Sequence, residues 1–328
     1  MERREKMKKI SFIKVILLFC MVLFAASAFA ADGAATPRFK PSISVGYAFS
    51  GGTDFDFTSV DGGTIYGGSR FDHSIPNLSG VYVAGDLLFN FTNRLSLTAG
   101  VKGTVSLKNG TDDETVGFTP PSYALRNWDA DNRYWCIADL LLSYAVVKDT
   151  SFLKDLSAVA GFRYDYHKMS FKNAQVTAGG LVSSPTDKTD IKMQTYSPVL
   201  GVTSTLQGFK SGIFGGDIKL SLLGSPFVFG KIDYTEGFAD PAFRFEVAEN
   251  FGRSYFLNIG AEVTAISAKI GPRADLTVAL FGQYTQFVID DKVTMTGVNG
   301  PGVAVTREFS FSSRPNMAVV GIKTAIEF

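Results

Sequence analysis

Cysteine and histidine are scarce in this chain, and their scarcity excludes several kinds of site. The chain has two cysteines and two histidines. Cys20 lies in the leader segment described below, so the mature chain keeps Cys136 alone, which excludes an internal disulfide and a cysteine metal site. His73 and His167 are too few for a histidine-rich metal centre. We therefore expect neither a metal ion nor another cofactor.

Long apolar runs, phosphate-binding glycine motifs and a surplus of basic residues are also missing. After residue 30, no run approaches the roughly 20 apolar residues of a membrane helix. The Walker-type, dinucleotide-binding and Gly-x-Ser-x-Gly patterns are absent. Without the leader, 26 basic and 29 acidic residues give a net charge of −3. This balance offers no electrostatic attraction for nucleic acid, so we expect no nucleic-acid partner.

Residues 1–30 have the features of a secretory signal peptide. A basic segment is followed by the apolar run Val15–Phe24 and by the small-x-small sequence Ala28-Phe29-Ala30. The apolar run is too short to span a bilayer as a helix. The sequence therefore predicts a cleaved signal peptide over residues 1–30 and a single exported domain over residues 31–328.

Apolar and polar residues alternate along most of the mature chain. In the segment 95–108, leucine, alanine and valine alternate with serine, threonine and the lysines Lys102 and Lys108. The segment Asn316–Phe328 alternates in the same way and ends on an aromatic residue. Strands of outer-membrane barrels have this pattern, because one face contacts lipid and the other lines a lumen. A lysine on the polar face indicates a hydrated or ion-paired lumen.

Segment lengths indicate how the strands are connected. We expect strands near residues 42–50, 78–89, 95–108, 133–147, 156–171, 191–206, 213–223, 254–267, 273–289 and 316–328. Long polar loops (51–70, 109–132, 173–190, 224–252 and 290–307) alternate with short turns (90–93, 148–154, 207–212 and 268–272). The sequence thus predicts an all-β fold, a transmembrane antiparallel up-and-down β-barrel of about ten strands. We expect it to be integral to the outer membrane, with periplasmic termini and long extracellular loops. The strand that ends at Phe328 is expected to contact the barrel-assembly machinery.

The order of these parts resembles the omptin family, outer-membrane endopeptidases built on a ten-stranded barrel. The resemblance covers nearly the whole mature chain in layout. The segments that carry it are Gly68–His73, Gly161-Phe162 with Met169–Phe171, Tyr196–Val202 and Asp240-Pro241. It implies an Asp pair on one side of a cleft and an Asp–His pair on the other, which together activate a water molecule for peptide hydrolysis.

Two acidic pairs match the first pair that the resemblance implies. Asp129 and Asp131 have the Asp-x-Asp form beside Trp128, whereas Asp112 and Glu114 lie closer to the expected distance from the preceding strand. An Asp-x-Asp sequence in a loop is more often a solvated turn than a functional pair. Both alternatives therefore stay open.

The Asp–His pair of the family is not matched at its expected place. Counting from Asp240, the position of the catalytic His holds Phe238, whose ring cannot accept a proton, and Glu236 replaces the Asp. Asp165 and His167 do have Asp-x-His spacing, which places both side chains on one face of a strand. They precede a different loop, and a polar pair at the rim or in the lumen is the commoner role for such spacing.

Three functions remain as hypotheses. The first is a non-catalytic, omptin-like outer-membrane barrel whose long extracellular loops contact surface partners. The alternative is an active omptin-type aspartic endopeptidase that uses Asp129, Asp131, Asp165 and His167. The third is a small pore or lipid-active barrel, although ten strands leave little room in the lumen.

The resemblance also implies outer-membrane lipid as a partner, including lipopolysaccharide bound by basic and aromatic residues of the outer wall. Arg163, Tyr164, Tyr166 and Lys168 lie near the matching place. Arg163 and Lys168 point to opposite faces of a strand, so at most one of them reaches a lipid phosphate. Girdle tyrosines and snorkelling cations are the plainer interpretation of this stretch.

Overall fold

The computed structural model describes residues 39–49, 53–62, 68–75, 79–106, 111–118, 123–178, 181–183, 188–208, 210–211, 213–237, 244–251, 254–271, 274–299 and 303–327. The predicted signal peptide and Phe328 lie outside these ranges. Within them, no helix is long and apolar enough to cross a membrane.

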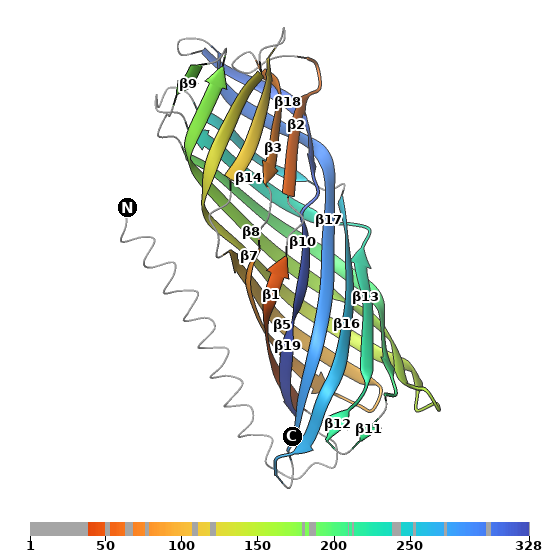
Figure 1. The fold of residues 1–328 in the computed structure, drawn as a ribbon. Helices are drawn as coiled ribbons and strands as arrows, with labels where there is room; N and C mark the ends of the chain where they lie inside the picture. Colours follow the sequence, from red (N-terminus) through yellow and green to blue (C-terminus); the bar gives the residue numbers. More distant parts are fainter. Residues whose placement is uncertain are drawn as a thin grey trace.

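The lower half of the molecule, as drawn in Figure 1, is a closed antiparallel ring of ten strands, here called the lower barrel. Around the ring the strands are β1 (Phe39–Phe49), β4 (Gly80–Asn90), β5 (Leu95–Ser106), β7 (Tyr123–Lys148), β8 (Leu153–Ala178), β10 (Lys188–Leu206), β13 (Ile218–Ser225), β16 (Ser254–Lys269), β17 (Asp275–Asn299) and β19 (Asn316–Glu327). The last strand pairs back with the first, from Ser42↔Ala325 to Phe49↔Ala318. The ring therefore has no free edge, and the predicted ten-stranded antiparallel barrel is confirmed.

The segments predicted as long loops are largely strands, so that part of the prediction is wrong. They contain β2 (Thr53–Ser59), β3 (Gly68–Ile75), β6 (Thr111–Phe118), β9 (Leu181–Ser183), β14 (Phe229–Gly237), β15 (Arg244–Phe251) and β18 (Val303–Ser313). All of these except β9 close a second ring with the upper parts of β7, β8, β10 and β17. This second ring continues the first and is here called the head.

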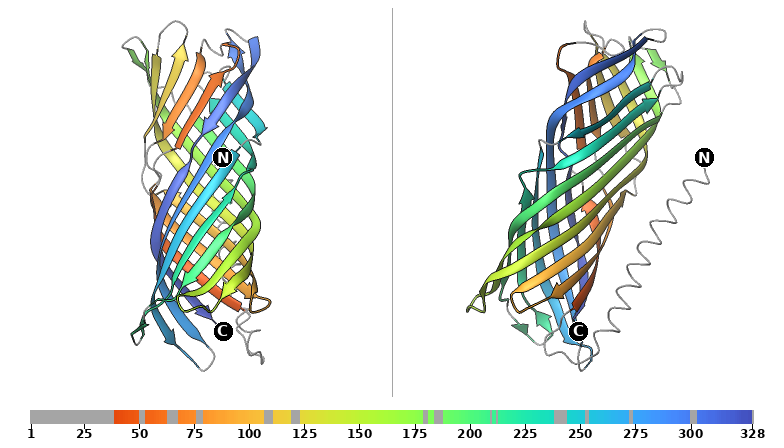
Figure 2. Two further views of the ribbon diagram at one scale, coloured as in Figure 1. Left: turned by 90° about the vertical axis from the view of Figure 1, so that its right-hand side faces the viewer. Right: turned by 180° about the vertical axis from the view of Figure 1, so that it is seen from behind.

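The longest strands run through both rings (Figure 2). β7 and β8 have 26 residues each, and β17 has 25. At about 3.3 Å per residue, a 26-residue strand is about 86 Å long. A tilt of about 40° leaves a height of about 65 Å, whereas the hydrocarbon core of a bilayer is about 30 Å thick. Roughly half of the cylinder is therefore available to stand outside the membrane.

Short connections close the lower end of the molecule. They cover residues 91–94, 149–152, 207–217 and 270–274, and the third contains the two-residue strands β11 (Lys210–Ser211) and β12 (Phe214–Gly215). In the first turn, Thr92 Oγ1 accepts hydrogen bonds from the backbone N–H groups of Arg94 and Leu95 at 3.1 and 2.9 Å. Such hydroxyl-capped turns let an antiparallel pair reverse within four residues. The prediction that the short turns lie together at one end of the barrel is confirmed.

Exposed apolar side chains cover the outside of the lower barrel. Along β1, the outward residues Ile43, Val45, Tyr47 and Phe49 are between 38% and 53% exposed. The alternate residues Ser42, Ser44 and Ala48 are buried and face the lumen. Apolar outside and polar inside is the surface of a membrane-spanning barrel.

The head has the opposite arrangement. On β2, Phe55 and Phe57 are fully buried in the interior, whereas Asp54 and Asp56 lie on the outer face. Phe55 stacks on Phe311 of β18 with ring centroids 6.3 Å apart. The interior of the head is thus an apolar core like that of a soluble barrel. Its other members include Met169, Ile191, Met193, Ile232, Tyr234, Ile289, Val293, Met295 and Phe309.

The inversion occurs along single uninterrupted strands. In the lower part of β17, Leu280 is 56% exposed on the outer face, and Thr285 is buried in the lumen. In its upper part, Val293 and Met295 are buried, and Lys292 lies on the exposed face. The outer face of the strand therefore changes from apolar to polar between the lower barrel and the head, and the inner face changes from polar to apolar.

Candidate functional site

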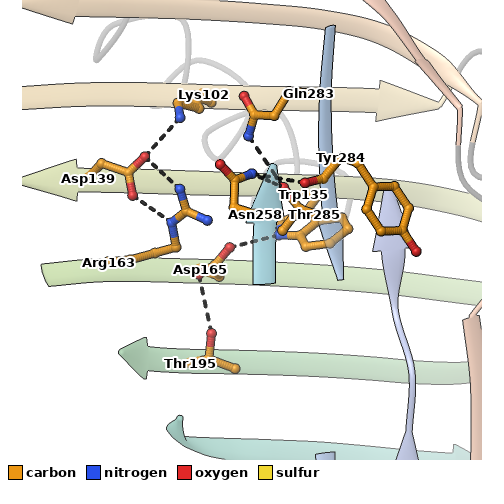
Figure 3. Close-up of polar contacts among 10 residues, drawn as sticks. All are labelled: Lys102, Trp135, Asp139, Arg163, Asp165, Thr195, Asn258, Gln283, Tyr284 and Thr285. Carbon is orange, nitrogen blue, oxygen red and sulfur yellow. Dashed lines mark hydrogen bonds and ion pairs between the residues drawn. The ribbon is translucent and has the colours of Figure 1, made fainter. Parts of the chain in front are cut away.

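A buried ion-pair cluster lies on three neighbouring strands of the lower barrel and faces its lumen (Figure 3). Arg163 of β8 donates from Nε and Nη2 to the two carboxylate oxygens of Asp139 on β7, at 2.6 and 3.0 Å. Lys102 of β5 contacts the same carboxylate at 2.9 Å. Arg163 has no exposed surface. Two cations share one carboxylate, and the bidentate geometry compensates for the desolvation of the guanidinium.

Asp165 and His167 follow on the same face of β8. They are 3% and 2% exposed, so both point into the interior and the prediction of a shared face is confirmed. Asp165 accepts hydrogen bonds from Trp135 Nε1 at 3.2 Å and from Thr195 Oγ1 at 3.4 Å. The His167 ring stacks on the Trp135 ring, with centroids 5.0 Å apart. Strand β8 continues to Ala178, so this pair lies about 35 Å along the strand below its upper end.

A neutral network covers the opposite wall at this level (Figure 3). Asn258 of β16 donates from Nδ2 to Thr285 Oγ1 at 2.6 Å and to the backbone carbonyl of Tyr284 at 3.2 Å. Gln283 of β17 donates to the same hydroxyl at 3.3 Å. These groups satisfy one another, which is the usual state of buried polar side chains.

Aromatic rings link the charged lumen to the apolar core of the head. Phe256 packs against Arg163, whose guanidinium carbon is 4.9 Å from the ring centroid. Phe287 lies 5.5 Å from Phe256 and 5.8 Å from Trp135, measured between ring centroids. The ring of His167 stacks on Trp135 from the other strand. Aromatic side chains therefore lie between the polar site and the head, and they separate the site from the upper end of the barrel.

The four residues predicted for catalysis lie on two neighbouring strands. In the register of β7 and β8, Asp129 pairs with Lys172, and Trp135 pairs with His167. Asp131 falls where this register shifts. These positions belong to one wall of the barrel, whereas the family arrangement has its pairs on opposite sides of a cleft. Only the backbone of Asp129 and Asp131 is described, so their catalytic role stays a prediction.

The remaining positions named for catalysis are described only in part. Asp112 and Glu114 lie on β6, which pairs with β7 next to Asp129. Phe238 lies outside the described residues, and Glu236 is near the end of β14. Among the described residues, no group of three or more His, Cys, Asp or Glu side chains is placed to hold a metal ion.

The sequence analysis did not identify the ion-pair cluster as a unit. Its signal was present in part, because Lys102 lies on the polar face of an alternating segment. The pairing itself depends on strand register, in which Asp139 lies beside Gly100 on one side and beside Arg163 on the other. Such a contact between distant positions cannot be read from local spacing.

The outer wall at the same height carries aromatic and basic side chains. Tyr164 of β8 lies 5.2 Å from Tyr196 of β10 between ring centroids. Lys168 Nζ lies 5.9 Å from the ring centroid of Tyr134, and Lys168 pairs in register with Lys192. Arg163 is buried inside, so Lys168 alone of the two predicted cations faces outward.

Comparison with known proteins shows which fold the chain has. No protein-family model and no curated protein sequence matches the chain. Among solved structures, the outer membrane protease OmpT from Escherichia coli matches with a TM-score of 0.66 and 13% identity, over 91% of this chain and 100% of that one. The translocator domain of the autotransporter NalP from Neisseria meningitidis matches over 95% of this chain and 96% of its own, with 11% identity and a TM-score of 0.32. The outer membrane protein AlkL matches over 91% and 95%, with 11% identity and a TM-score of 0.28. At this identity, the likeness to OmpT establishes the fold alone: the chain has the closed ten-stranded barrel of an omptin, at a great distance in sequence.

Proposed function

We propose that this chain is a non-catalytic outer-membrane barrel, which projects a solid head from the cell surface to contact partners. The observation that carries the proposal is the apolar interior of the head. Phe55, Phe57, Phe309 and Phe311 are each fully buried there. A hydrolase needs an accessible cleft in which a substrate and a water molecule meet polar groups. In this head the corresponding volume holds packed rings, so its outer hairpins are the surface left for function.

The same proposal includes a placement of the protein in the outer membrane. The apolar belt would lie in the outer membrane, with the short turns in the periplasm and the head outside. Export would use the predicted signal peptide over residues 1–30. The closing strand that ends at Phe328 would contact the barrel-assembly machinery during insertion. Cell fractionation and protease accessibility of the head hairpins test this placement.

Peptide cleavage by intact cells tests the catalytic assignment. We expect no cleavage of basic peptides above that of cells lacking the gene, and no change with His167→Ala. Cleavage that His167→Ala abolishes, while a matched Ser44→Ala variant on β1 retains it, would contradict the proposal. Both substitutions lie on the lumenal face, so the comparison separates a chemical role from a general effect on packing.

The endopeptidase remains the alternative because two observations favour it. The overall likeness is to a protease, and Asp165 and His167 lie on one face of β8. In that reading, Asp165 would orient His167 as a general base, with Asp129 and Asp131 polarising the water. The peptide assay described above decides between the two proposals.

A small pore is a third candidate, and the polar lumen of the lower barrel is the observation that favours it. Against it, Arg163 and the aromatic side chains above it fill the passage. We expect no conductance steps when the purified protein is inserted into a planar bilayer. Regular steps that disappear when the protein is omitted would establish a pore.

Outer-membrane lipid is the partner that we propose for the wall. Lys168, beside the Tyr134 ring and next to Lys192 in register, would contact phosphate groups of lipopolysaccharide at the upper border of the apolar belt. Binding of purified lipopolysaccharide should weaken with Lys168→Gln and stay unchanged with Lys148→Gln, an exposed lysine at the other end of the barrel. Equal binding by both variants would remove Lys168 from the proposal.

A further inference from the structure

Each of the four short connections at the lower end carries an exposed large apolar side chain (Figure 1). Phe91, Phe152, Ile213 and Ile270 lie in the four connections in chain order and are between 51% and 67% exposed. A single exposed apolar residue on a protein surface is normal and needs no explanation. One in every short turn of the same end is a pattern, and it indicates that these turns have a common contact.

The length of the uncharged outer wall shows where the turns lie relative to a bilayer. On β8, the outward residues from Leu156 to Tyr166 carry no charge, and charged residues occur on either side, Lys168 above and Lys154 below. The two lysines are 14 residues apart. At about 3.3 Å per residue and a tilt of about 40°, they differ in height by about 35 Å. The hydrocarbon core of a bilayer, about 30 Å thick, therefore fits between them and leaves little of the wall over.

Strand β17, four strands further around the ring, gives the same result. Its outward residues from Leu276 to Val288 carry no charge, and Asp290 is the first charged residue on this face above them. Asp290 is 15 residues above Asp275, where the strand begins. This separation corresponds to a height of about 38 Å. On both sides of the barrel, the uncharged wall thus extends down to the short turns.

The turns fall in the layer that lies directly below the hydrocarbon core. Phe152 precedes Lys154 by two residues, which is about 5 Å of height. The headgroup layer on each side of a bilayer is about 5–7 Å thick, because the whole bilayer is about 40–45 Å thick. A barrel whose uncharged wall covers the hydrocarbon core therefore has its short turns among lipid headgroups.

The turns also continue the lipid-facing wall. The ring of Phe91 lies edge-on to the ring of Phe89, with centroids 4.7 Å apart, and Phe89 is an exposed outward residue of β4. Neighbouring connections are joined by backbone hydrogen bonds, because the Gln207 N–H donates to the Phe152 carbonyl at 2.8 Å. The four turns are thus the lower margin of one apolar surface.

We propose that Phe91, Phe152, Ile213 and Ile270, here called the lower rim, bind the phospholipid headgroup layer of the periplasmic leaflet. The inference rests on the proposed placement of the protein in the outer membrane. Aromatic and branched apolar side chains are stabilised when they move from water to the boundary between headgroups and acyl chains. A shift of the barrel in one direction would carry the lower rim into water. A shift in the other would carry charged residues into hydrocarbon, so the lower rim fixes the height at which the head stands.

Depth-dependent fluorescence quenching tests the proposal. In a Cys136→Ser background, Asn93→Cys carries a nitrobenzoxadiazole label in the same turn as Phe91, and the protein is inserted into phosphatidylcholine vesicles. Val60→Cys carries the same label on the outside of the head, where Val60 is 46% exposed. With a water-soluble nitroxide on both sides of the membrane, we expect the label at residue 93 to be quenched at least about twofold less than the label at residue 60. A nitroxide attached to the lipid headgroup should give the opposite order.

Removal of one apolar side chain tests the lower rim itself. With the label at residue 93, Phe91→Ser should raise quenching by the water-soluble nitroxide about twofold or more, because the turn loses its contact with lipid. The matched control Val60→Ser, in the head, should leave this quenching unchanged. Gly271→Cys with Ile270→Ser repeats the experiment in another turn, where a side chain added at Gly271 meets nothing within 4 Å.

A label on the wall separates this inference from the proposed placement. Leu200 is 60% exposed and pairs with Ala160, near the middle of the uncharged stretch of β8. A label at Leu200→Cys should be quenched most by a nitroxide deep in the acyl chains, and failure of this quenching would overturn the placement and the inference together. If it succeeds, strong quenching from water at residue 93 overturns the inference alone. Protection of residue 93 from both the water-soluble and the headgroup nitroxide also overturns it, because a protein contact would then cover the turns.

Discussion

Asp139 holds two cations in the lumen, and its loss would leave both without a direct counter-charge. Arg163 has no exposed surface and Lys102 is 15% exposed, so solvent cannot replace the carboxylate fully. We predict that Asp139→Asn lowers the free energy of unfolding by about 3–5 kcal/mol, the usual effect of removing one partner of a buried pair. Urea unfolding of the barrel in detergent micelles measures the change.

The matched control is an exposed pair in the head. Lys292 and Glu308 contact at 2.7 Å with side chains that are 59% and 53% exposed. We predict that Lys292→Gln changes the free energy of unfolding by less than about 1 kcal/mol. Equal effects of Asp139→Asn and Lys292→Gln would show that water reaches the cluster and replaces the lost carboxylate.

At the scale of the strands, two neighbouring backbones approach closely at Gly161. A methyl group added to Gly161 of β8 would overlap the backbone carbonyl of Leu140 on β7. A methyl group on Gly271, in a short turn, would have nothing within 4 Å. We predict that Gly161→Ala destabilises the barrel by about 1–3 kcal/mol and that Gly271→Ala is nearly neutral. Urea unfolding distinguishes them, and similar values for both variants would contradict the pairing of β7 with β8.

The strands also show which features local sequence can predict. The lower barrel was predictable because an apolar face of Ile, Val, Leu and aromatic residues alternates with a polar face, as in Ile43–Phe49. The strands of the head alternate just as regularly, as in Asp54-Phe55-Asp56-Phe57, but they lie between glycine-rich segments, so the sequence predicts loops there. In the structure, their apolar residues face inward. A prediction that expects apolar residues on the outer, lipid-facing side of a barrel therefore finds no membrane strand there. The site was predicted less well, because Asp139, Arg163 and Lys102 meet through strand register.

At the scale of the whole molecule, the apolar and polar faces of the strands are exchanged between the lower barrel and the head. This exchange explains the surface and the interior of each part. In the lower barrel, lipid outside favours apolar residues on the wall, and the lumen keeps ion pairs such as Lys323–Glu262. In the head, water outside favours polar residues on the wall, and the interior becomes an apolar core. All four methionines of the mature chain are buried in this interior or at its base, where flexible side chains fill irregular space. The fold of an omptin is thereby combined with a closed upper end.

The most direct test of this account is whether the interior of the head excludes a water-soluble reagent. In a Cys136→Ser background, Met193→Cys places a thiol in the core, where Met193 is 3% exposed, and Val60→Cys places one on the outside, where Val60 is 46% exposed. With folded protein and a polar maleimide, we predict that Met193→Cys reacts at least about 100-fold more slowly, because its reaction requires local opening of the core. Equal rates at the two positions would show an open cleft in the head and would contradict the account.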